Sequence, residues 1–158
     1  MGSGYRKHTE LPVYKLSFDL AKQIFDISRG FRKEGRYSLT DQILRSSRSV
    51  CANLAEAWRK RRYRGAFISK LSDAEADAAE TQVWLQFVVQ CCYVDRELVA
   101  ELYEQYDEAL AQIVSLIHNT DSGLSEHPNN RDPPNTVSSH PYPPIPSFPI
   151  SPISKHAH

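Results

Sequence analysis

The strongest constraint on the fold is an apolar stripe in the second half of the chain. Its members follow one another in alternating steps of four and three, and they are Phe67, Leu71, Ala74, Ala78, Thr81, Leu85, Val88 and Cys92. Steps of this kind place successive side chains on one face of an α-helix. A strand would instead alternate at every second residue, and the chain has no such segment. The stripe therefore predicts a long helix with one face to bury.

Three other segments repeat this spacing. The first holds Leu16, Leu20, Ile24, Ile27 and Phe31, the second Ile43, Ser47, Val50, Leu54 and Trp58, and the last Leu98, Leu102, Tyr106, Ala109, Ile113 and Leu116. Four stripes of similar length bury each other best as a bundle, and short connections make sequence neighbours antiparallel. We expect an all-α fold, an antiparallel up-down-up-down four-helix bundle over residues 12–118.

Turn and capping residues suggest where the helices begin and end. Gly35 breaks the first helical pattern, and a hydroxyl of Ser38 or Thr40 can cap the second helix. The second connection falls within residues 58–65. Asp95 marks the start of the fourth helix, because an acidic residue is favourable at a positive helix end.

The two ends of the chain lie outside the predicted bundle. Nine of the ten prolines fall from Asn119 onward, and no helical pattern continues there. Segments of this composition bury too little apolar area to offset their loss of backbone entropy. We expect residues 119–158 to be a disordered Pro-rich tail and residues 1–11 to be an N-terminal extension.

The formal net charge of zero conceals a strong asymmetry along the chain. Residues 29–64 hold eleven Lys and Arg against three acids, whereas residues 65–118 hold two against ten. Such a distribution predicts a molecule with a basic face and an acidic face. The basic face is suited to a polyanion or to the acidic face of another copy.

The basic residues are densest between Arg59 and Arg64, where only Tyr63 interrupts them. A helix C-terminus favours one or two cations, so the mutual repulsion of the others calls for an anion. Phosphate groups or a neighbour's acidic helix would supply it, and Tyr63 and Trp58 offer faces for unpaired bases. Arg45 and Arg48 can instead pair with acids of the third helix. The predicted nucleic-acid-binding residues are Arg45, Arg48, Arg59, Lys60, Arg61, Arg62 and Arg64.

Two rows of acidic residues suggest an enzymatic function as an alternative to binding. Asp73, Asp77 and Glu80 form one row, and Glu97, Glu101, Glu104 and Asp107 form the other. Two such rows suit a divalent cation in a magnesium-dependent nucleotide hydrolase. However, the first three predicted helices hold no histidine, and even spacing is typical of a solvated or intersubunit face. We expect no catalysis, no metal site, no cofactor and no small-molecule substrate.

The cysteines and the hydropathy of the chain indicate the cellular compartment of the protein. Cys51, Cys91 and Cys92 form neither a disulfide framework nor a metal-binding pair, and Cys51 lies within an apolar stripe. The sequence has no signal peptide, and no apolar run approaches the ~18 residues that span a bilayer. We expect a cytoplasmic protein without membrane contact.

The stretch "LTDQILRSSRSVCANLAEAWRKRR" also resembles the signature of a known family. These are bacterial four-helix-bundle proteins, first noticed as reading frames in intervening sequences of large-subunit ribosomal RNA genes. The matching residues are Leu39, Gln42 and Arg45, then Asn53, Leu54, Ala55 and Glu56. The third helix matches at Phe67, Leu71, Ala74, Glu80 and Leu85, and Ala57 departs from the glycine that the family commonly has.

The resemblance implies a bundle that assembles into a ring, often a pentamer, with no assigned catalytic residues. Its motif residues Gln42, Asn53, Glu56 and Glu80 suggest a polar network at a helix or subunit contact, or else a solvated face. The leading interpretation is an oligomeric bundle that binds RNA or another nucleic acid. The alternatives are a homo-oligomeric scaffold or protein adaptor and, third, the magnesium-dependent hydrolase.

Overall fold

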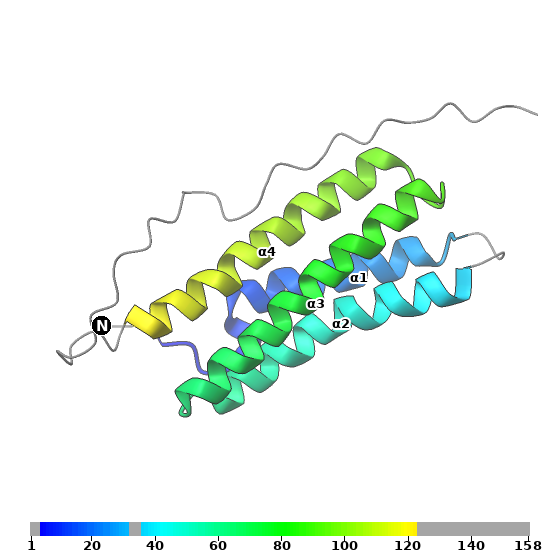
Figure 1. Ribbon diagram of the computed structural model, residues 1–158. Helices are drawn as coiled ribbons and strands as arrows, with labels where there is room; N and C mark the ends of the chain where they lie inside the picture. The colour runs from blue at the N-terminus through cyan, green and yellow to red at the C-terminus, as the bar shows by residue number, and fades with distance from the viewer. Residues whose placement is uncertain (1–3, 32–35, 123–158) are drawn as a thin grey trace, which may run out of the picture. The chain divides into compact units, whose positions relative to one another are not determined.

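Four long helices make up the ordered part of the protein (Figure 1). The computed structural model describes residues 4–31 and 36–122, and in these ranges it contains no strand. A short 3₁₀ helix, η1, spans His8–Glu10, and the α-helices are α1 (Pro12–Ser28), α2 (Arg36–Lys60), α3 (Arg64–Gln90) and α4 (Arg96–Ser122). The predicted four-helix fold class is confirmed.

The helices form a closed, antiparallel bundle. The backbones approach closely between α1 and α2, α2 and α3, α3 and α4, and α4 and α1, whereas the described parts of the diagonal pairs have no such close backbone approach. The interface between α2 and α3 is the most extensive. The C-terminus of α2, the N-terminus of α3 and the C-terminus of α4 therefore share one end of the bundle, seen at the left in Figure 1.

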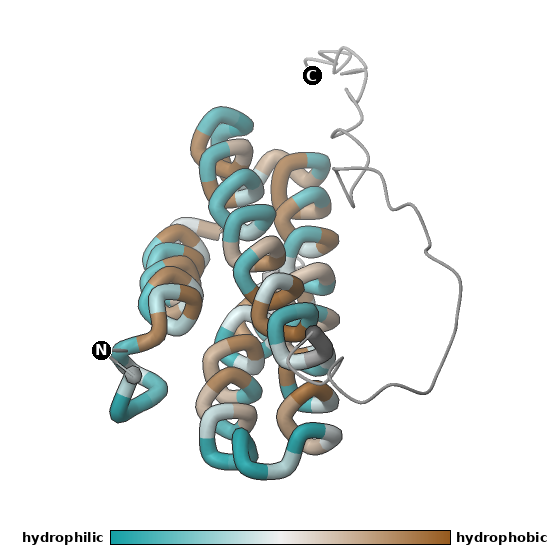
Figure 2. Tube along the Cα trace, turned by 90° about the vertical axis from the view of Figure 1, so that its left-hand side faces the viewer, coloured by the Kyte–Doolittle hydropathy of each residue, from teal (hydrophilic) through white to brown (hydrophobic). Residues whose placement is uncertain are grey.

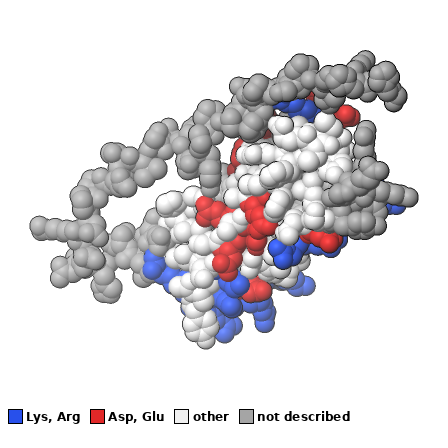
Figure 3. Space-filling model, turned by 45° about the vertical axis from the view of Figure 1, so that its right-hand side comes forward, with Lys and Arg blue, Asp and Glu red and all other residues white. Residues whose placement is uncertain are grey.

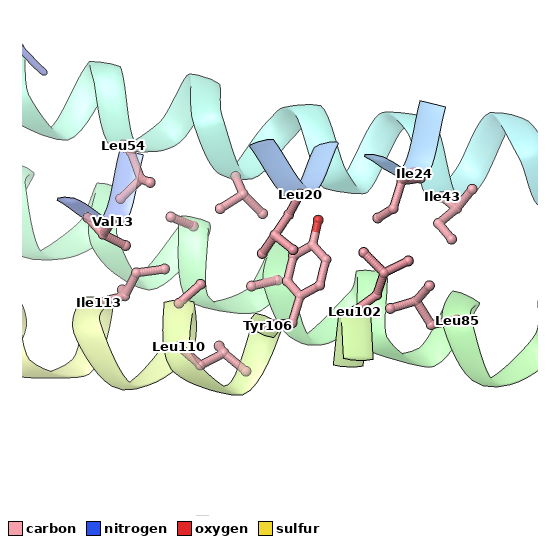
Figure 4. Close-up of a cluster of buried hydrophobic side chains, with 14 of the residues drawn as sticks. Val13, Leu20, Ile24, Ile43, Leu54, Leu85, Leu102, Tyr106, Leu110 and Ile113 are labelled. Carbon is pink, nitrogen blue, oxygen red and sulfur yellow. The ribbon is translucent and has the colours of Figure 1, made fainter. Parts of the chain in front are cut away.

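The predicted stripes form the core. Figure 4 shows apolar side chains from all four helices meeting along the bundle axis, with the Tyr106 ring among them. Fully buried positions include Leu20, Ile24, Ile43, Leu54, Leu71, Leu85, Leu102, Tyr106, Leu110 and Ile113. Burying one such side chain contributes roughly 1.5–3 kcal/mol. Figure 2 shows the result along the trace, where hydrophobic and hydrophilic segments alternate in each helix.

The start of α2 differs from the sequence prediction. The helix already begins at Arg36, so Ser38 and Thr40 lie inside it and do not cap it. Thr40 Oγ1 is buried without a hydrogen-bond partner, which is incompatible with a capping role. Gly35, the predicted break, lies outside the described residues.

The connection between α3 and α4 follows a regular pattern. The Tyr93 amide donates to the Val88 carbonyl at 3.0 Å and the Cys92 amide to the Val89 carbonyl at 2.9 Å. This is the Schellman arrangement, with Cys92 in the left-handed position at φ 57°. Asp95 then precedes α4, and its carbonyl accepts from the Val99 amide, as the predicted helix start requires.

The last helix extends past the boundary set from the sequence. α4 continues beyond His118 to Ser122, so the first residues assigned to the tail are helical. The predicted tail from residue 123 onward lies outside the described part of the chain. None of the described helices is both long enough and apolar enough to cross a membrane.

Candidate nucleic-acid interface

The densest positive charge lies where α2 turns into α3. We call residues 59–64, which end α2 and lead into α3, the basic turn. The Tyr63 amide donates to the Lys60 carbonyl at 2.8 Å, and the Phe67 amide donates to the Tyr63 carbonyl at 2.9 Å. These bonds hold the backbone of Tyr63 from both sides. The predicted location of this connection, within residues 58–65, is confirmed.

Every side chain of the basic turn is exposed, namely Arg59, Lys60, Arg61, Arg62, Tyr63 and Arg64. Figure 3 shows Lys and Arg gathered along the lower part of one face, at the level of α2 and the basic turn in Figure 1, with a band of acids above them. The charge asymmetry of the sequence thus appears on the surface as adjacent basic and acidic regions.

Two arginines of the basic turn make contacts within the protein. Arg61 Nη1 donates to the Trp58 carbonyl at 2.7 Å, and its guanidinium lies 4.4 Å from the centre of the Trp58 ring. Arg64 Nε approaches the Thr120 carbonyl of α4 at 3.5 Å. For Arg59, Lys60 and Arg62, the described part of the chain offers no ion-pair partner. Three cations of the basic turn are therefore available to an external anion.

The helix ends around the basic turn compensate only part of this charge. Arg59 and Lys60 lie in the last turn of α2, where the partial negative charge favours cations by about 0.3–1 kcal/mol each. Arg62 and Arg64 adjoin the positive N-terminus of α3, whose first turn contains no acid. Their charges are not offset by the helix dipole, so this end of the bundle keeps a positive potential.

Arg45 and Arg48 form a separate group. They are exposed on the middle of α2, and Arg48 lies about 16 Å along the helix from Arg59 at 1.5 Å per residue. Arg45 Nη2 donates to Gln42 Oε1 at 2.9 Å, and the Arg48 guanidinium lies 5.9 Å from the centre of the Phe25 ring on α1. These contacts are not with acids of α3. The seven predicted residues therefore do not form one continuous cluster.

A polar network joins α2 to α3 next to the basic turn. Lys70 Nζ donates to Asn53 Oδ1 at 3.2 Å and lies 3.2 Å from Glu56 Oε2 and 3.1 Å from Asp73 Oδ2. Asn53 Nδ2 in turn donates to Asp77 Oδ2 at 2.7 Å. Sequence reasoning singled out Asn53 and Glu56 but missed Lys70, the cation between them.

The other two motif residues lie apart from this network. Glu80 Oε1 accepts from Trp84 Nε1 at 3.0 Å, and Gln42 accepts from Arg45. Between them, Thr81 Oγ1 donates to Ser46 Oγ at 2.8 Å across the α2–α3 interface. The four motif residues therefore do not form a single hydrogen-bonded network.

Four of the seven acids considered for a metal site have partners within the protein, namely Asp73, Asp77, Glu80 and Asp107. Burial raises the pKa of Asp77, and hydrogen bonds from Asn53 and Ser49 partly offset the rise. Asp107 of the second acidic row accepts from Gln82 Nε2 at 2.7 Å. Among the residues described, no three acidic, histidine or cysteine side chains are grouped so that they could hold a metal ion. The hydrolase alternative stays an untested prediction.

Aromatic side chains are exposed elsewhere on the bundle. Phe18 and Phe25 on α1 are 58% and 42% exposed, and Phe87 on α3 is 51% exposed. Phe87 also lies against Trp84, with ring centres 5.8 Å apart. We call Tyr14, Phe18 and Phe25 the α1 aromatic stripe. Phe18 and Phe25 are exposed, whereas Tyr14 is half-buried against the core and stacks on Phe18.

Comparison with known proteins agrees with this architecture. A family profile described as "23S rRNA-intervening sequence protein" matches residues 9–115. The chain is also similar to a crystal structure from Bacteroides thetaiotaomicron, titled a protein with unknown function from the S23 ribosomal protein family. The two are 30% identical, the match covers 67% of this chain and 95% of that one, and the TM-score is 0.62. No curated protein matches.

Proposed function

This chain belongs to the family of 23S rRNA-intervening sequence proteins, and we propose that it binds nucleic acid, RNA foremost, through the basic turn. The proposed role is binding without catalysis, in a reducing cytoplasm where the three cysteines stay thiols. All three are free cysteines in the structure.

The observation that carries this proposal is the lack of internal partners for Arg59, Lys60 and Arg62. Within the described residues, none of the three forms an ion pair, although acids lie nearby on α3. Lys70 holds Asp73 and Glu56 at 3.1 and 3.2 Å. Exposed cations that are not neutralised by their own protein attract polyanions, and release of counterions from phosphates supplies the free energy.

The proposal is tested by a pair of matched double variants in the full chain. Arg59→Ala with Arg62→Ala removes two cations from the basic turn, whereas Arg29→Ala with Arg96→Ala removes two exposed cations from the opposite end of the bundle. Arg61 is left in place because it packs on Trp58. Fluorescence anisotropy with a labelled structured RNA gives the dissociation constant of each protein.

We expect the basic-turn variant to bind at least ten times more weakly than the control variant at 50 mM salt. Each lost phosphate contact removes one released counterion, so its affinity also becomes less dependent on salt. Circular dichroism should show equal helical content for both variants. Equal affinities would mean that the basic turn is not the binding surface, and an absence of binding by the wild type would reject the proposal.

We propose self-association as a second role, because Phe18 and Phe25 of the α1 aromatic stripe are exposed on the bundle. Large apolar side chains grouped on a surface favour a protein contact. The proposed occupant is a second copy of this chain, within a ring. The adjacent basic and acidic regions of Figure 3 give copies complementary charges.

Sedimentation velocity tests self-association independently of RNA. Phe18→Ser with Phe25→Ser should lower the sedimentation coefficient to that of a monomer, while Arg59→Ala with Arg62→Ala should leave it unchanged. If the arginine variant dissociates instead, the basic turn is an assembly element that pairs with an acidic helix of another copy.

A further inference from the structure

Tyr63 is the most exposed large hydrophobic or aromatic side chain in the described part of the protein. The residue is 71% exposed, and its ring makes no ring contact with the described residues. Trp58, five positions earlier, is half-buried against the core and has its ring covered by the Arg61 guanidinium at 4.4 Å. Of the two aromatic residues at this end of α2, only Tyr63 presents an open face.

The backbone fixes the point from which this ring projects. Tyr63 directly precedes α3 in an extended conformation, with φ −114° and ψ 98°. Its amide and carbonyl are both hydrogen-bonded, to Lys60 and Phe67 at 2.8 and 2.9 Å. With the backbone held, only the two χ angles of the tyrosine remain to be ordered when a flat partner stacks on the ring. The exposed Tyr63 ring can therefore stack on a flat partner at a small entropic cost.

The charges around Tyr63 limit what that partner is. Arg62 adjoins it in sequence, and Arg59 and Lys60 lie within one helical turn, all exposed. A partner must therefore offer a flat apolar face close to several negative charges. An unpaired nucleotide offers both, since its base has a free face and its backbone carries phosphates. A duplex hides its base faces in its own stack and offers only the phosphates.

We propose that the basic turn takes single-stranded nucleic acid, with Tyr63 stacked on an unpaired base while Arg59, Lys60 and Arg62 contact the flanking phosphates. This inference rests on the proposed nucleic-acid binding and names the class of ligand. It assigns Tyr63 a role that is distinct from that of its cationic neighbours, since stacking contributes affinity without releasing a counterion.

The test compares three labelled probes in anisotropy titrations with the full chain. One is an RNA hairpin with a ten-nucleotide loop, the second is the same stem closed as a blunt RNA duplex, and the third is the loop sequence as single-stranded DNA. The variants are Tyr63→Ala and Tyr63→Phe. Phe87→Ala is the matched control, because it removes an exposed aromatic ring from the far end of α3.

We expect the wild type to prefer the hairpin and the DNA strand to the duplex. Tyr63→Ala should weaken binding to both probes with unpaired bases by roughly 5- to 150-fold, the range of one base stack, and change duplex binding little. Tyr63→Phe and Phe87→Ala should bind like the wild type. A preference of the hairpin over the DNA strand would identify RNA as the ligand.

The salt dependence separates stacking from charge. Tyr63→Ala should keep the wild-type slope of log K against log salt for the probes with unpaired bases, whereas Arg59→Ala should reduce its magnitude by about 0.7. Equal loss of hairpin and duplex binding in Tyr63→Ala, or no loss in either, would overturn the stacking role and leave the basic turn as a phosphate-binding surface. No binding of the wild type to any probe would overturn the proposed function itself.

Discussion

Asn53 on α2 and Asp77 on α3 are joined by a hydrogen bond of 2.7 Å from the amide nitrogen to a carboxylate oxygen. The amide oxygen of Asn53 accepts from Lys70, so one side chain connects a cation to an anion across the most extensive interface of the bundle. The Lys70 ammonium has three donors, and its three neighbours are Asn53, Glu56 and Asp73.

Replacement of Lys70 by Met should lower the unfolding midpoint in urea at pH 7. The variant leaves the carboxylates of Glu56 and Asp73 close together without their cation. The hydrogen bonds to Asp73 and Glu56 raise the pKa of Lys70 above its ordinary value of 10.5. A raised lysine pKa stabilises the fold at all pH values below 10.5, and this stabilisation is lost as the pH rises through the higher value of the folded state.

The midpoint difference between wild type and Lys70→Met should therefore be constant from pH 7 to about pH 10 and shrink above it. Lys22→Met is the control, since Lys22 pairs with Asp26 on the surface of α1 and both side chains are at least half exposed. A Lys70→Met variant as stable as the Lys22→Met variant at pH 7 would show that the network does not hold α2 against α3.

Replacement of Cys92 by Gly should stabilise the bundle by roughly 0.5–1 kcal/mol. Cys92 has a left-handed backbone at φ 57°, which costs an L-residue roughly 1–2 kcal/mol, whereas glycine adopts this conformation freely. Glycine also raises the conformational entropy of the unfolded chain, which cancels part of the stabilisation. Cys91→Gly is the control, because Cys91 has φ −83°. Urea unfolding measures both, and equal effects would contradict the assigned strain.

Replacement of Tyr106 by Phe should leave the free energy of unfolding unchanged or raise it by about 1 kcal/mol. The Tyr106 side chain is fully buried, and its hydroxyl, although close to Thr81, makes no hydrogen bond of good geometry with the described residues. An unsatisfied buried polar group is costly, so its removal is favourable. Tyr106→Ala, which empties the same space, should cost about 3–5 kcal/mol. A loss above 1 kcal/mol for Tyr106→Phe would indicate an unrecognised partner of the hydroxyl.

Cys51 should react with thiol reagents far more slowly than Cys91 and Cys92. Burial raises the pKa of the Cys51 thiol to about 11, so at pH 8 the thiolate is about one part in a thousand. Cys91 and Cys92 are exposed. Titration with a disulfide reagent at pH 8 should release two equivalents quickly and the third only after denaturation. Fast release of three equivalents would show that Cys51 is accessible.

The architecture was predictable because it depends on the spacing of apolar residues. The stripe from Leu71 to Val88 lies in the core as expected, and Asp95 precedes α4. The start of α2 was not predictable from its hydroxyl residues. Ser46 and Ser47 show the reason, since their hydroxyls donate to the carbonyls of Ile43 and Leu44 within the helix. Ser46 and Ser47 thus serve close packing and local bonding inside α2, so a hydroxyl residue in this segment need not mark the start of the helix.

The candidate site was predictable in part. Five cations in six positions indicate the basic turn without any knowledge of the packing. The role of Lys70 depends on which turn of α3 lies beside Asn53 and Glu56, and periodicity within one helix carries no information on that register. Likewise, the sequence could not show that Arg61 covers Trp58 while the Tyr63 ring stays open.

The most direct test of the central claim is the salt dependence of binding between the full chain and a single-stranded RNA loop. If Arg59, Lys60 and Arg62 each contact a phosphate, the slope of log K against log salt should be about −2, and it should flatten to about −0.7 in the variant that lacks Arg59 and Arg62. A slope near zero, or the same slope in wild type and variant, would contradict the assignment of the basic turn as the nucleic-acid-binding surface.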